Sequence, residues 1–178
     1  MIGVLVSGTG TNLQALLDAG LPVVAVASNR ADAPALARAG AIPVAAFELA
    51  GYADRGARDA AMAEWLAAHG VTIVVLAGYM HILTAAFLER FPRAVVNVHP
   101  SLLPEFPGAH AVEEQLRAGV SESGATVHLV DEGVDSGPVL AQERVSVLPG
   151  DTPETLHERI KELEHRLLPR VVEELCAR

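Results

Sequence analysis

The hydrophobic pattern divides most of the chain into short apolar runs separated by longer amphipathic stretches. Ile2 to Val6 and Val23 to Ala27 are apolar runs of strand length, and Val71 to Ala77 is almost entirely apolar. Such runs are typical of strands that are buried on both faces of a parallel sheet. Between them, stretches such as Asp54 to His69 carry apolar residues at helical spacing. The pattern predicts an α/β fold, a Rossmann-like three-layer sandwich with helices on both faces of a mostly parallel sheet.

The C-terminal third departs from this pattern. Ala125 to Val130 alternates between two faces, and a strand-like stretch from Val139 to Val147 follows a short polar connection. Because that connection is too short for a crossover, we expect the later strand to be antiparallel. Asp151, Thr152 and Pro153 then begin a long helix. The apolar stripe that should face the sheet consists of Leu156, Ile160, Leu163 and Leu167.

Length and composition fit one ordinary domain, residues 1–178. Hydrophobic residues make up 51% of the chain but aromatic residues only 4%, so the core is built mainly from Ala, Val and Leu. No apolar run approaches the roughly 20 residues of a membrane span, and no basic leader precedes the first strand. We therefore expect a cytoplasmic protein with no membrane partner.

Charge and cysteine content narrow the function further. The formal charge of −9, with only 13 lysine and arginine residues, argues against a nucleic-acid partner. The single cysteine, Cys176, excludes an internal disulfide and a cysteine metal cluster. The histidines show no metal-binding spacing, since His157 and His165 are too far apart on one helix to share an ion. We therefore expect no metal cofactor.

The first turn contains the glycine-rich segment Gly8-Thr9-Gly10-Thr11-Asn12 between an apolar strand and a helix. If Thr11 or Asn12 caps this helix, the free N–H groups of its first turn form an anion site. Leu13 occupies the place of the third glycine of a dinucleotide fingerprint, and no Walker lysine is present. A phosphate monoester suits this loop better than a dinucleotide does. That the glycines only form a tight turn is an equally open interpretation.

The segment Val95 to Pro104 is an apolar run that turns polar and then meets a proline. Side chains on a strand alternate between faces, so Asn97 and His99 should point the same way. Pro100 cannot donate to a sheet ladder and should end the strand. In an open parallel sheet this carboxyl end is where ligands bind.

The residue types at this strand end suit acyl transfer between two bound substrates. The chain has no Gly-x-Ser-x-Gly elbow that would favour a covalent acyl-enzyme. An amide N–H from Asn97 and an imidazolium from His99 can stabilise an oxyanion, and a carboxylate from the acidic loop after Val130 can assist proton transfer. From spacing alone, a buried Asn and His that only satisfy one another are as plausible as a catalytic pair.

Three motifs together closely resemble the folate-dependent formyltransferases. They are Asn97-Val98-His99-Pro100-Ser101-Leu102-Leu103-Pro104, Gly133-Val134-Asp135-Ser136-Gly137-Pro138 and Gly8-Thr9-Gly10-Thr11-Asn12. The first motif, with the downstream aspartate, is specific to that group as a whole. The glycine-rich loop, Phe106-Pro107-Gly108 and Glu164-His165 narrow the resemblance to the phosphoribosylglycinamide formyltransferases. The resemblance runs from Ile2 to about Pro169 and implies the formyltransferase fold.

This resemblance implies a reaction and a set of catalytic residues. The formyl group of 10-formyltetrahydrofolate, a co-substrate, would pass to the amine of 5-phosphoribosyl glycinamide in de novo purine biosynthesis. His99 would act as general acid and oxyanion partner, Asn97 as oxyanion donor, and Asp135 as the group that tunes His99 and relays a proton through water. Gly10, Thr11 and Asn12 would hold the substrate phosphate, and Lys161 and Glu164 would face the ribosyl glycinamide.

The resemblance also implies a folate site. The folate would lie against Met80, His81, Ile82 and Leu83, beside Asn97. Its pterin would be wrapped by the loop residues Asp131, Glu132, Gly133, Val134 and Asp135. Arg55 would lie near its glutamate end, although Arg58 is close by in the sequence. His81 stands where such enzymes usually have a longer basic residue.

Several alternatives share these residues. Formyltetrahydrofolate hydrolase is similar around Asn97, His99 and Asp135 but passes the formyl group to water. Methionyl-tRNA formyltransferase has a similar core, but a charge of −9 suits tRNA poorly. A non-catalytic nucleotide-binding module could have kept the same fold. For the oligomeric state, both a monomer and a homodimer fit the sequence.

Overall fold

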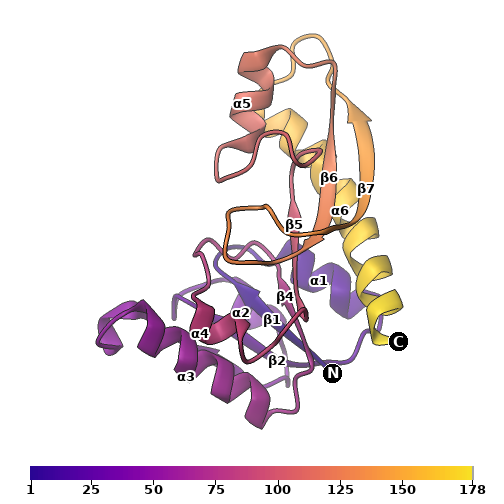
Figure 1. Cartoon of the computed structure of the whole chain (residues 1–178). Helices are drawn as coiled ribbons and strands as arrows, with labels where there is room; N and C mark the ends of the chain where they lie inside the picture. The colour runs from indigo at the N-terminus through magenta and orange to yellow at the C-terminus, as the bar shows by residue number, and fades with distance from the viewer. Residues whose placement is uncertain (178) are drawn as a thin grey trace. The chain divides into compact units, whose positions relative to one another are not determined.

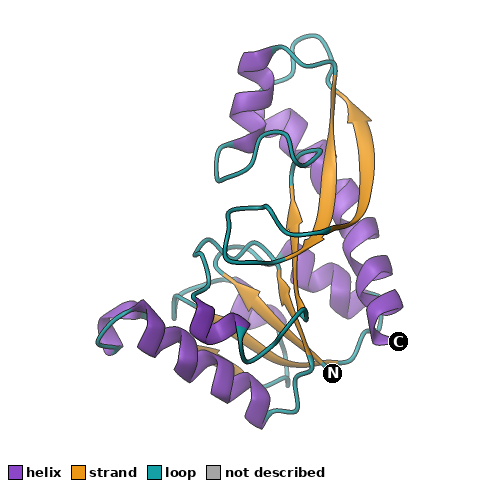
Figure 2. Ribbon diagram, in the orientation of Figure 1, coloured by secondary structure: helices purple, strands orange, loops and turns teal. Residues whose placement is uncertain are grey.

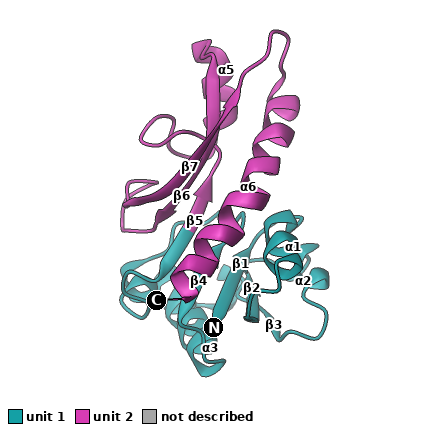
Figure 3. Cartoon of the chain, turned by 90° about the vertical axis from the view of Figure 1, so that its right-hand side faces the viewer, with its two compact units in different colours: residues 1–96 teal, residues 97–178 magenta. Residues whose placement is uncertain are grey.

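A computed structural model describes residues 1–177, and Figures 1 and 2 show its helices and strands. The chain divides into two compact units, the first from Met1 to Val96 and the second from Asn97 onward (Figure 3). Within residues 1–177, every helix is too short or too polar to span a bilayer.

Unit 1 is built on four parallel strands in the order β3-β2-β1-β4. The strands are β1 (Ile2–Val6), β2 (Val23–Ser28), β3 (Val44–Ala46) and β4 (Ile73–Leu76). The helices are α1 (Thr11–Asp18), α2 (Ala35–Arg38), α3 (Arg55–Ala68) and α4 (Ala85–Leu88), with a short 3-10 helix η1 (Leu49–Gly51). All five residues of β1 are buried, as the unbroken apolar run predicts for a central strand.

The strand order places a switch point between β1 and β4. The chain runs outward from β1 through β2 to β3 and then returns to the other side of β1 to form β4. Because crossovers between parallel strands are right-handed, α3 on the return connection covers the opposite face from α1 and α2. Open α/β sheets bind ligands at the carboxyl ends of strands beside such a point. The loops that follow β1 and β4 therefore hold the first candidate site residues.

Unit 2 contains two long strands, a short helix and a long helix. Strand β5 (Val95–His99) enters it from unit 1, and β6 (Glu122–Leu129) pairs with β7 (Val139–Ser146) in antiparallel register. The helices are α5 (Ala111–Ala118) and α6 (Pro153–Cys176), and α6 packs on β6 and β7. The hydrogen-bonding order of all seven strands is β3-β2-β1-β4-β5-β6-β7. The predicted α/β class, mostly parallel with an antiparallel C-terminal strand, is confirmed.

The start of α6 is fixed by side-chain hydrogen bonds. Thr152 is the N-cap, and its hydroxyl and that of Thr155 form a capping box with the opposite backbone N–H groups. Asp151 accepts hydrogen bonds from both terminal nitrogens of Arg159, at 2.8 and 2.9 Å, and from the N–H of Leu148 at 2.7 Å. The Arg159 guanidinium, followed by the Leu148 N–H, holds the pKa of Asp151 well below its usual range.

We expect Asp151→Asn to destabilise the fold in a pH-dependent way. The folded-state pKa lies below the unfolded value near 3.8, so the ionised carboxylate stabilises the fold above that value. This contribution is lost as the pH falls toward the folded-state pKa. The thermal midpoint of the variant should therefore lie below that of the native protein at pH 7, and the difference should shrink between about pH 4 and pH 2.

The exposed carboxylate of Asp18 provides the matched control, because its hydrogen bond comes only from the neutral Gln14 amide. Asp18→Asn should leave the thermal midpoint at pH 7 nearly unchanged. A midpoint of Asp151→Asn equal to the native one at pH 7, or a deficit that persists undiminished at pH 2, would contradict this role.

Candidate functional site

The loops after β1 and β4 are joined directly in unit 1. The N–H of Ser7, which follows β1, donates to the carbonyl of Gly78, which follows β4, at 3.2 Å. The hydroxyl of Ser7 accepts the N–H of Met80 at 2.9 Å. The predicted phosphate loop and the predicted folate loop are therefore neighbours at the switch point of the sheet.

The glycine-rich loop forms the start of α1 in a different way from the prediction. Helix α1 begins at Thr11, and its N-cap is Gly10, with a φ of 76° and no side-chain cap. The expectation that Thr11 or Asn12 caps the helix is wrong, because both already lie inside it. An added Cβ at Gly10 would lie 2.6 Å from the Cβ of Ala35. The loop therefore needs glycine at position 10 for both its conformation and its packing.

The loop after β4 presents large apolar side chains to solvent on a firmly held backbone. Met80 is 66% exposed and Ile82 51% exposed, whereas Leu83 is only 4% exposed and belongs to the core. The carbonyl of Ile82 accepts a hydrogen bond from the Arg55 guanidinium, and the N–H of Thr84 donates to Asp59 at 2.8 Å. Exposed apolar groups on an ordered loop are typical of a ligand surface.

The two arginines near this loop have different environments. The Arg58 side chain is fully buried and donates two hydrogen bonds to Asp59, at 2.9 and 2.6 Å. Arg55 is exposed and reaches the loop carbonyl of Ile82. Arg55 is therefore the guanidinium that a ligand can reach, while Arg58 is committed to its buried ion pair.

His81 is held by Arg58 on one ring nitrogen. Arg58 Nη1 lies 2.7 Å from His81 Nδ1, and a guanidinium can only donate, so Nδ1 accepts. Asn29 Nδ2, also a donor, lies 3.2 Å from His81 Nε2, so both ring nitrogens face N–H groups, which disfavours the imidazolium. Burial, followed by the charges of Arg58 and Arg55, lowers the pKa of His81 below its usual 6.5. The loop thus presents a neutral imidazole near pH 7.

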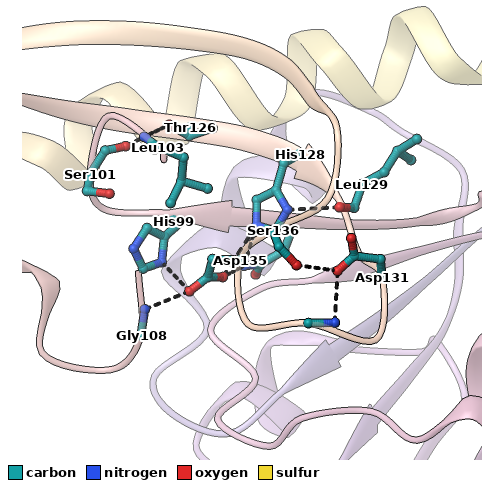
Figure 4. Close-up of polar contacts among 12 residues, drawn as sticks. His99, Ser101, Leu103, Gly108, Thr126, His128, Leu129, Asp131, Asp135 and Ser136 are labelled. Atoms are coloured by element: carbon teal, nitrogen blue, oxygen red, sulfur yellow. Dashed lines mark hydrogen bonds and ion pairs between the residues drawn. The ribbon is translucent and has the colours of Figure 1, made fainter. Parts of the chain in front are cut away.

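The end of β5 brings the three predicted catalytic residues together in unit 2, and Figure 4 shows His99 and Asp135 in contact. Asn97 Nδ2 donates to Asp135 Oδ1 at 3.3 Å, and His99 Nδ1 lies 3.3 Å from Asp135 Oδ2. His99 is 5% exposed, and the side chain of Asp135 is 13% exposed. Asn97 and His99, two residues apart on one strand, thus contact the same carboxylate, which comes from a separate loop.

The loop after β5 completes this cluster through its backbone. His99 Nε2 lies 2.8 Å from the carbonyl oxygen of Phe106, which can only accept, so Nε2 carries a hydrogen. The N–H of Gly108 donates to Asp135 Oδ2 at 2.8 Å. With Nε2 protonated, the imidazolium form of His99 also donates from Nδ1 toward Asp135.

His128 on β6 is a fourth member that the sequence prediction missed. Its Nδ1 lies 2.9 Å from the Leu129 carbonyl and must donate to it, as Figure 4 shows. Its Nε2 lies 3.1 Å from Asn97 Nδ2 and 3.4 Å from Asp135 Oδ1. With a neutral ring, His128 Nε2 accepts a hydrogen from the Asn97 amide, whereas the imidazolium form of His128 donates from Nε2 to Asp135. The only sequence signal was its position on one face of an alternating strand.

Asp135 is held in its ionised form by these neighbours. Burial by itself would raise the pKa of Asp135, but hydrogen bonds from His128 and from the Gly108 N–H, together with nearby His99, outweigh it. The net effect is a pKa below the usual 3.8. The residue has a φ of 52°, a left-handed conformation that is uncommon outside glycine and Asn or Asp.

The rest of the acidic loop is a tight turn closed by Asp131. Asp131 Oδ1 accepts the N–H of Gly133 at 3.0 Å and the hydroxyl of Ser136 at 2.8 Å. An added Cβ at Gly137 would collide with the backbone of Leu129, so the loop returns close to the end of β6. The predicted ligand residues Glu132, Gly133 and Val134 are exposed at its tip.

The two predicted substrate residues on α6 differ in burial. Glu164 is 5% exposed, so it belongs to the buried side of the helix. Lys161 forms an ion pair with Glu158 at 2.6 Å on the outer part of the helix. Among residues 1–177, no group of three or more His, Cys, Asp or Glu side chains is placed to hold a metal ion.

Comparisons with known proteins agree with this architecture. The family model described as "Formyl transferase" matches residues 1–172. The chain is 49% identical over 179 residues to the phosphoribosylglycinamide formyltransferase of Mycobacterium tuberculosis (strain CDC 1551 / Oshkosh), a match covering 97% of this chain and 83% of that protein.

Two solved structures are similar across most of their length. Glycinamide ribonucleotide transformylase 1 from Symbiobacterium toebii has a TM-score of 0.94 at 47% identity, covering 96% of this chain and 84% of that one. The phosphoribosylglycinamide formyltransferase from Streptococcus pneumoniae TIGR4 also has a TM-score of 0.94, at 43% identity, covering 98% of this chain and 97% of that one.

The environment of His81 predicts its titration. In a histidine-resolved NMR titration, the ring of His81 should titrate below pH 6.5. Arg55→Met removes one of the positive charges that disfavour the imidazolium, so it should raise the pKa of His81 toward the usual value. Arg38→Met, which removes an exposed arginine bound to Thr9 and Gln14, should leave the titration unchanged. Titration of the native His81 above its usual value would overturn this picture.

Proposed function

Because the chain belongs to the formyl transferase family, we propose that it is a phosphoribosylglycinamide formyltransferase of de novo purine (IMP) biosynthesis. It transfers the formyl group of 10-formyltetrahydrofolate to the amine of 5-phosphoribosyl glycinamide. The observation that carries this proposal is the convergence of Asn97 and His99 on the carboxylate of Asp135. Direct attack by the amine needs no nucleophilic side chain, and the cluster contains no serine, cysteine or lysine in that role.

Asn97 and His99 supply the oxyanion site. Both donors approach Asp135 at 3.3 Å, longer than the roughly 2.7–2.9 Å of a strong charge-assisted hydrogen bond. Such long contacts exchange readily, so a formyl oxygen beside Asp135 can accept one hydrogen from Asn97 Nδ2 and one from His99 Nδ1. The Gly108 N–H still holds Asp135 when this exchange occurs. A single oxyanion donor typically lowers the barrier by about 3 kcal/mol.

His99 and Asp135 also handle the proton that the reaction moves. When the amine attacks the formyl carbon, a C–N bond forms and the amine nitrogen becomes positively charged. It must lose one proton, and the folate nitrogen must gain one as its bond to the formyl carbon breaks. His99, as imidazolium, is the acid for this step, and ionised Asp135 balances its charge and accepts the amine proton through water. A proton then passes from Asp135 to His99 Nδ1, which lies 3.3 Å away, and the pair returns to its initial protonation state.

The glycine-rich loop binds the phosphate of the glycinamide nucleotide in this proposal. The left-handed Gly10 leaves the N–H groups of Thr11 and Asn12 at the positive end of α1, which favours an anion. Lys161 and Glu164 on α6 face the ribosyl glycinamide. Because Glu164 is buried, its carboxylate needs hydrogen-bond donors, and hydroxyl or amine groups of a substrate can supply them.

In this proposal the loop after β4 and the acidic loop of unit 2 each supply residues that contact the folate. Met80 and Ile82 offer exposed apolar surface, while His81 and buried Leu83 fix the loop between them. Residues 131–135, with Asn97, surround the pterin. Arg55 is the exposed cation for the glutamate carboxylates, because His81 is neutral near pH 7 and Arg58 is buried.

In this proposal the whole chain, residues 1–178, acts as one formyltransferase domain on two small molecules. It works in the cytoplasm, as a monomer or homodimer, without nucleic acid and without a metal. The net charge of −9 supports the lack of a nucleic-acid partner.

The proposal predicts nucleotide-dependent turnover that requires His99. Purified protein is mixed with 10-formyltetrahydrofolate, and tetrahydrofolate release is followed with and without the glycinamide nucleotide. Release should need the nucleotide and match the amount of formylated nucleotide formed. His99→Ala should lower kcat by about a hundredfold or more, the usual scale for a general acid, without unfolding the protein.

The matched control is His69→Ala, since His69 is the C-cap of α3 and its ring contacts the carbonyl and the indole ring of Trp65 rather than the proposed site. It should turn over normally. Release of tetrahydrofolate without nucleotide would instead support formyltetrahydrofolate hydrolysis. No release under any condition would support a non-catalytic nucleotide-binding module, and normal turnover of His99→Ala would reduce His99 to a packing residue.

A further inference from the structure

Three alternate residues on one face of β6 lie against the loop after β5 or against the residues that this loop contacts. Gly124, Thr126 and His128 alternate with residues of the other face. An added Cβ at Gly124 would lie 2.6 Å from Leu102 Cδ2, so the loop side chain lies directly over the strand. His128 contacts Asn97 and Asp135 at the far end of this face. Thr126, between them, is fully buried.

The Thr126 hydroxyl forms hydrogen bonds with the loop after β5 and with a residue of β7 that also binds this loop. Its hydroxyl donates to the Ser101 carbonyl at 2.6 Å and accepts the N–H of Leu103 at 3.1 Å, as Figure 4 shows. The remaining partner is the side-chain amide of Gln142 on β7, whose Nε2 lies 2.9 Å from Thr126 Oγ1. The same Nε2 donates to the Leu103 carbonyl at 2.7 Å. Gln142 thus binds the loop and the residue that holds the loop.

The loop of residues 101–108 also supplies the backbone groups that contact His99 and Asp135. The Phe106 carbonyl accepts the Nε2 hydrogen of His99, and the Gly108 N–H donates to Asp135. The rings of Pro104 and Pro107 fix their φ angles. The backbone between Leu103, which is held by hydrogen bonds, and these two contacts therefore has little freedom to rotate. Phe106 itself has a φ of 53°, which a bulky residue keeps only when its surroundings impose it.

We propose that Gln142 is a positioning residue for the transfer reaction, acting through the loop of residues 101–108 on His99 and Asp135. It touches neither catalytic side chain. Its two donated hydrogen bonds fix Leu103 and Thr126, and through them the carbonyl and N–H groups that orient the imidazole and the carboxylate. Gln142 lies on the exposed side of β7, so its removal leaves the core intact. This inference rests on the proposed roles of His99 and Asp135.

Gln142→Met tests the role, because it keeps the length of the side chain and removes both donated hydrogen bonds. We expect kcat to fall roughly tenfold to a hundredfold, the scale of a misplaced catalytic group. KM for both substrates should stay within about twofold. The alkaline limb of the kcat profile should move to lower pH, because the imidazolium loses a fixed acceptor for its Nε2 hydrogen. Gln142→Glu, which cannot donate either when ionised, should behave in the same way.

Arg144→Met is the matched control, since Arg144 lies two residues along the same exposed face and bonds only Glu122. It should change neither kcat nor the pH profile. Native kcat with a native pH profile in Gln142→Met, or an equal loss in Arg144→Met, would overturn the positioning role. His99→Ala is run in parallel: if it is fully active, the proposed site has failed, whereas a dead His99→Ala beside an unchanged Gln142→Met refutes only this inference.

Discussion

The structure around the end of β5 depends on one largely buried carboxylate. Asp135 is approached by four groups, with Asn97 and His128 on one oxygen and His99 and Gly108 on the other. A buried charge without partners would be costly, so these groups and the carboxylate stabilise one another. Their hydrogen bonds outweigh burial and keep Asp135 ionised. An ionised Asp135 in turn determines how the His99 ring and the Asn97 amide are oriented.

The scaffold supplies this carboxylate and its partners from separate elements. β5 delivers Asn97 and His99, β6 delivers His128, and the turn closed by Asp131 returns Asp135 to them in a left-handed conformation. The loop of residues 101–108 adds two backbone groups, the Phe106 carbonyl that contacts His99 and the Gly108 N–H that contacts Asp135. In unit 1, the switch point between β1 and β4 is followed by a separate pair of loops, one glycine-rich and one with exposed apolar side chains. In the proposed function, strands hold the catalytic side chains and the loops contact the ligands.

The sequence predicted the parts of the site that follow from local rules. Strand alternation placed Asn97 and His99 on one side, and Pro100 marked the end of β5. The apolar stripe of α6 and the antiparallel β7 were also predicted correctly. The predicted roles of these residues came from the motif resemblance, and only kinetics tests them.

The features that the sequence did not predict depend on tertiary contacts. Alternation placed His128 on a face but could not say that its ring meets Asn97, because strand register is set by packing between strands. The cap of α1 was assigned to Thr11 or Asn12, yet Gly10 fills it because Ala35 packs against that turn. Spacing alone could not distinguish Arg55 from Arg58, because the burial of Arg58 depends on Asp59 and His81.

The most direct test of the account is the kinetics of Asp135→Asn. The isosteric amide keeps the shape of the carboxylate but carries no charge, and its NH₂ group must face two of the four groups that now approach Asp135. We expect a folded protein whose kcat for nucleotide-dependent formyl transfer falls by about a hundredfold or more, with KM values changed by no more than about threefold. A kcat within about threefold of the native value would contradict the central role of this carboxylate.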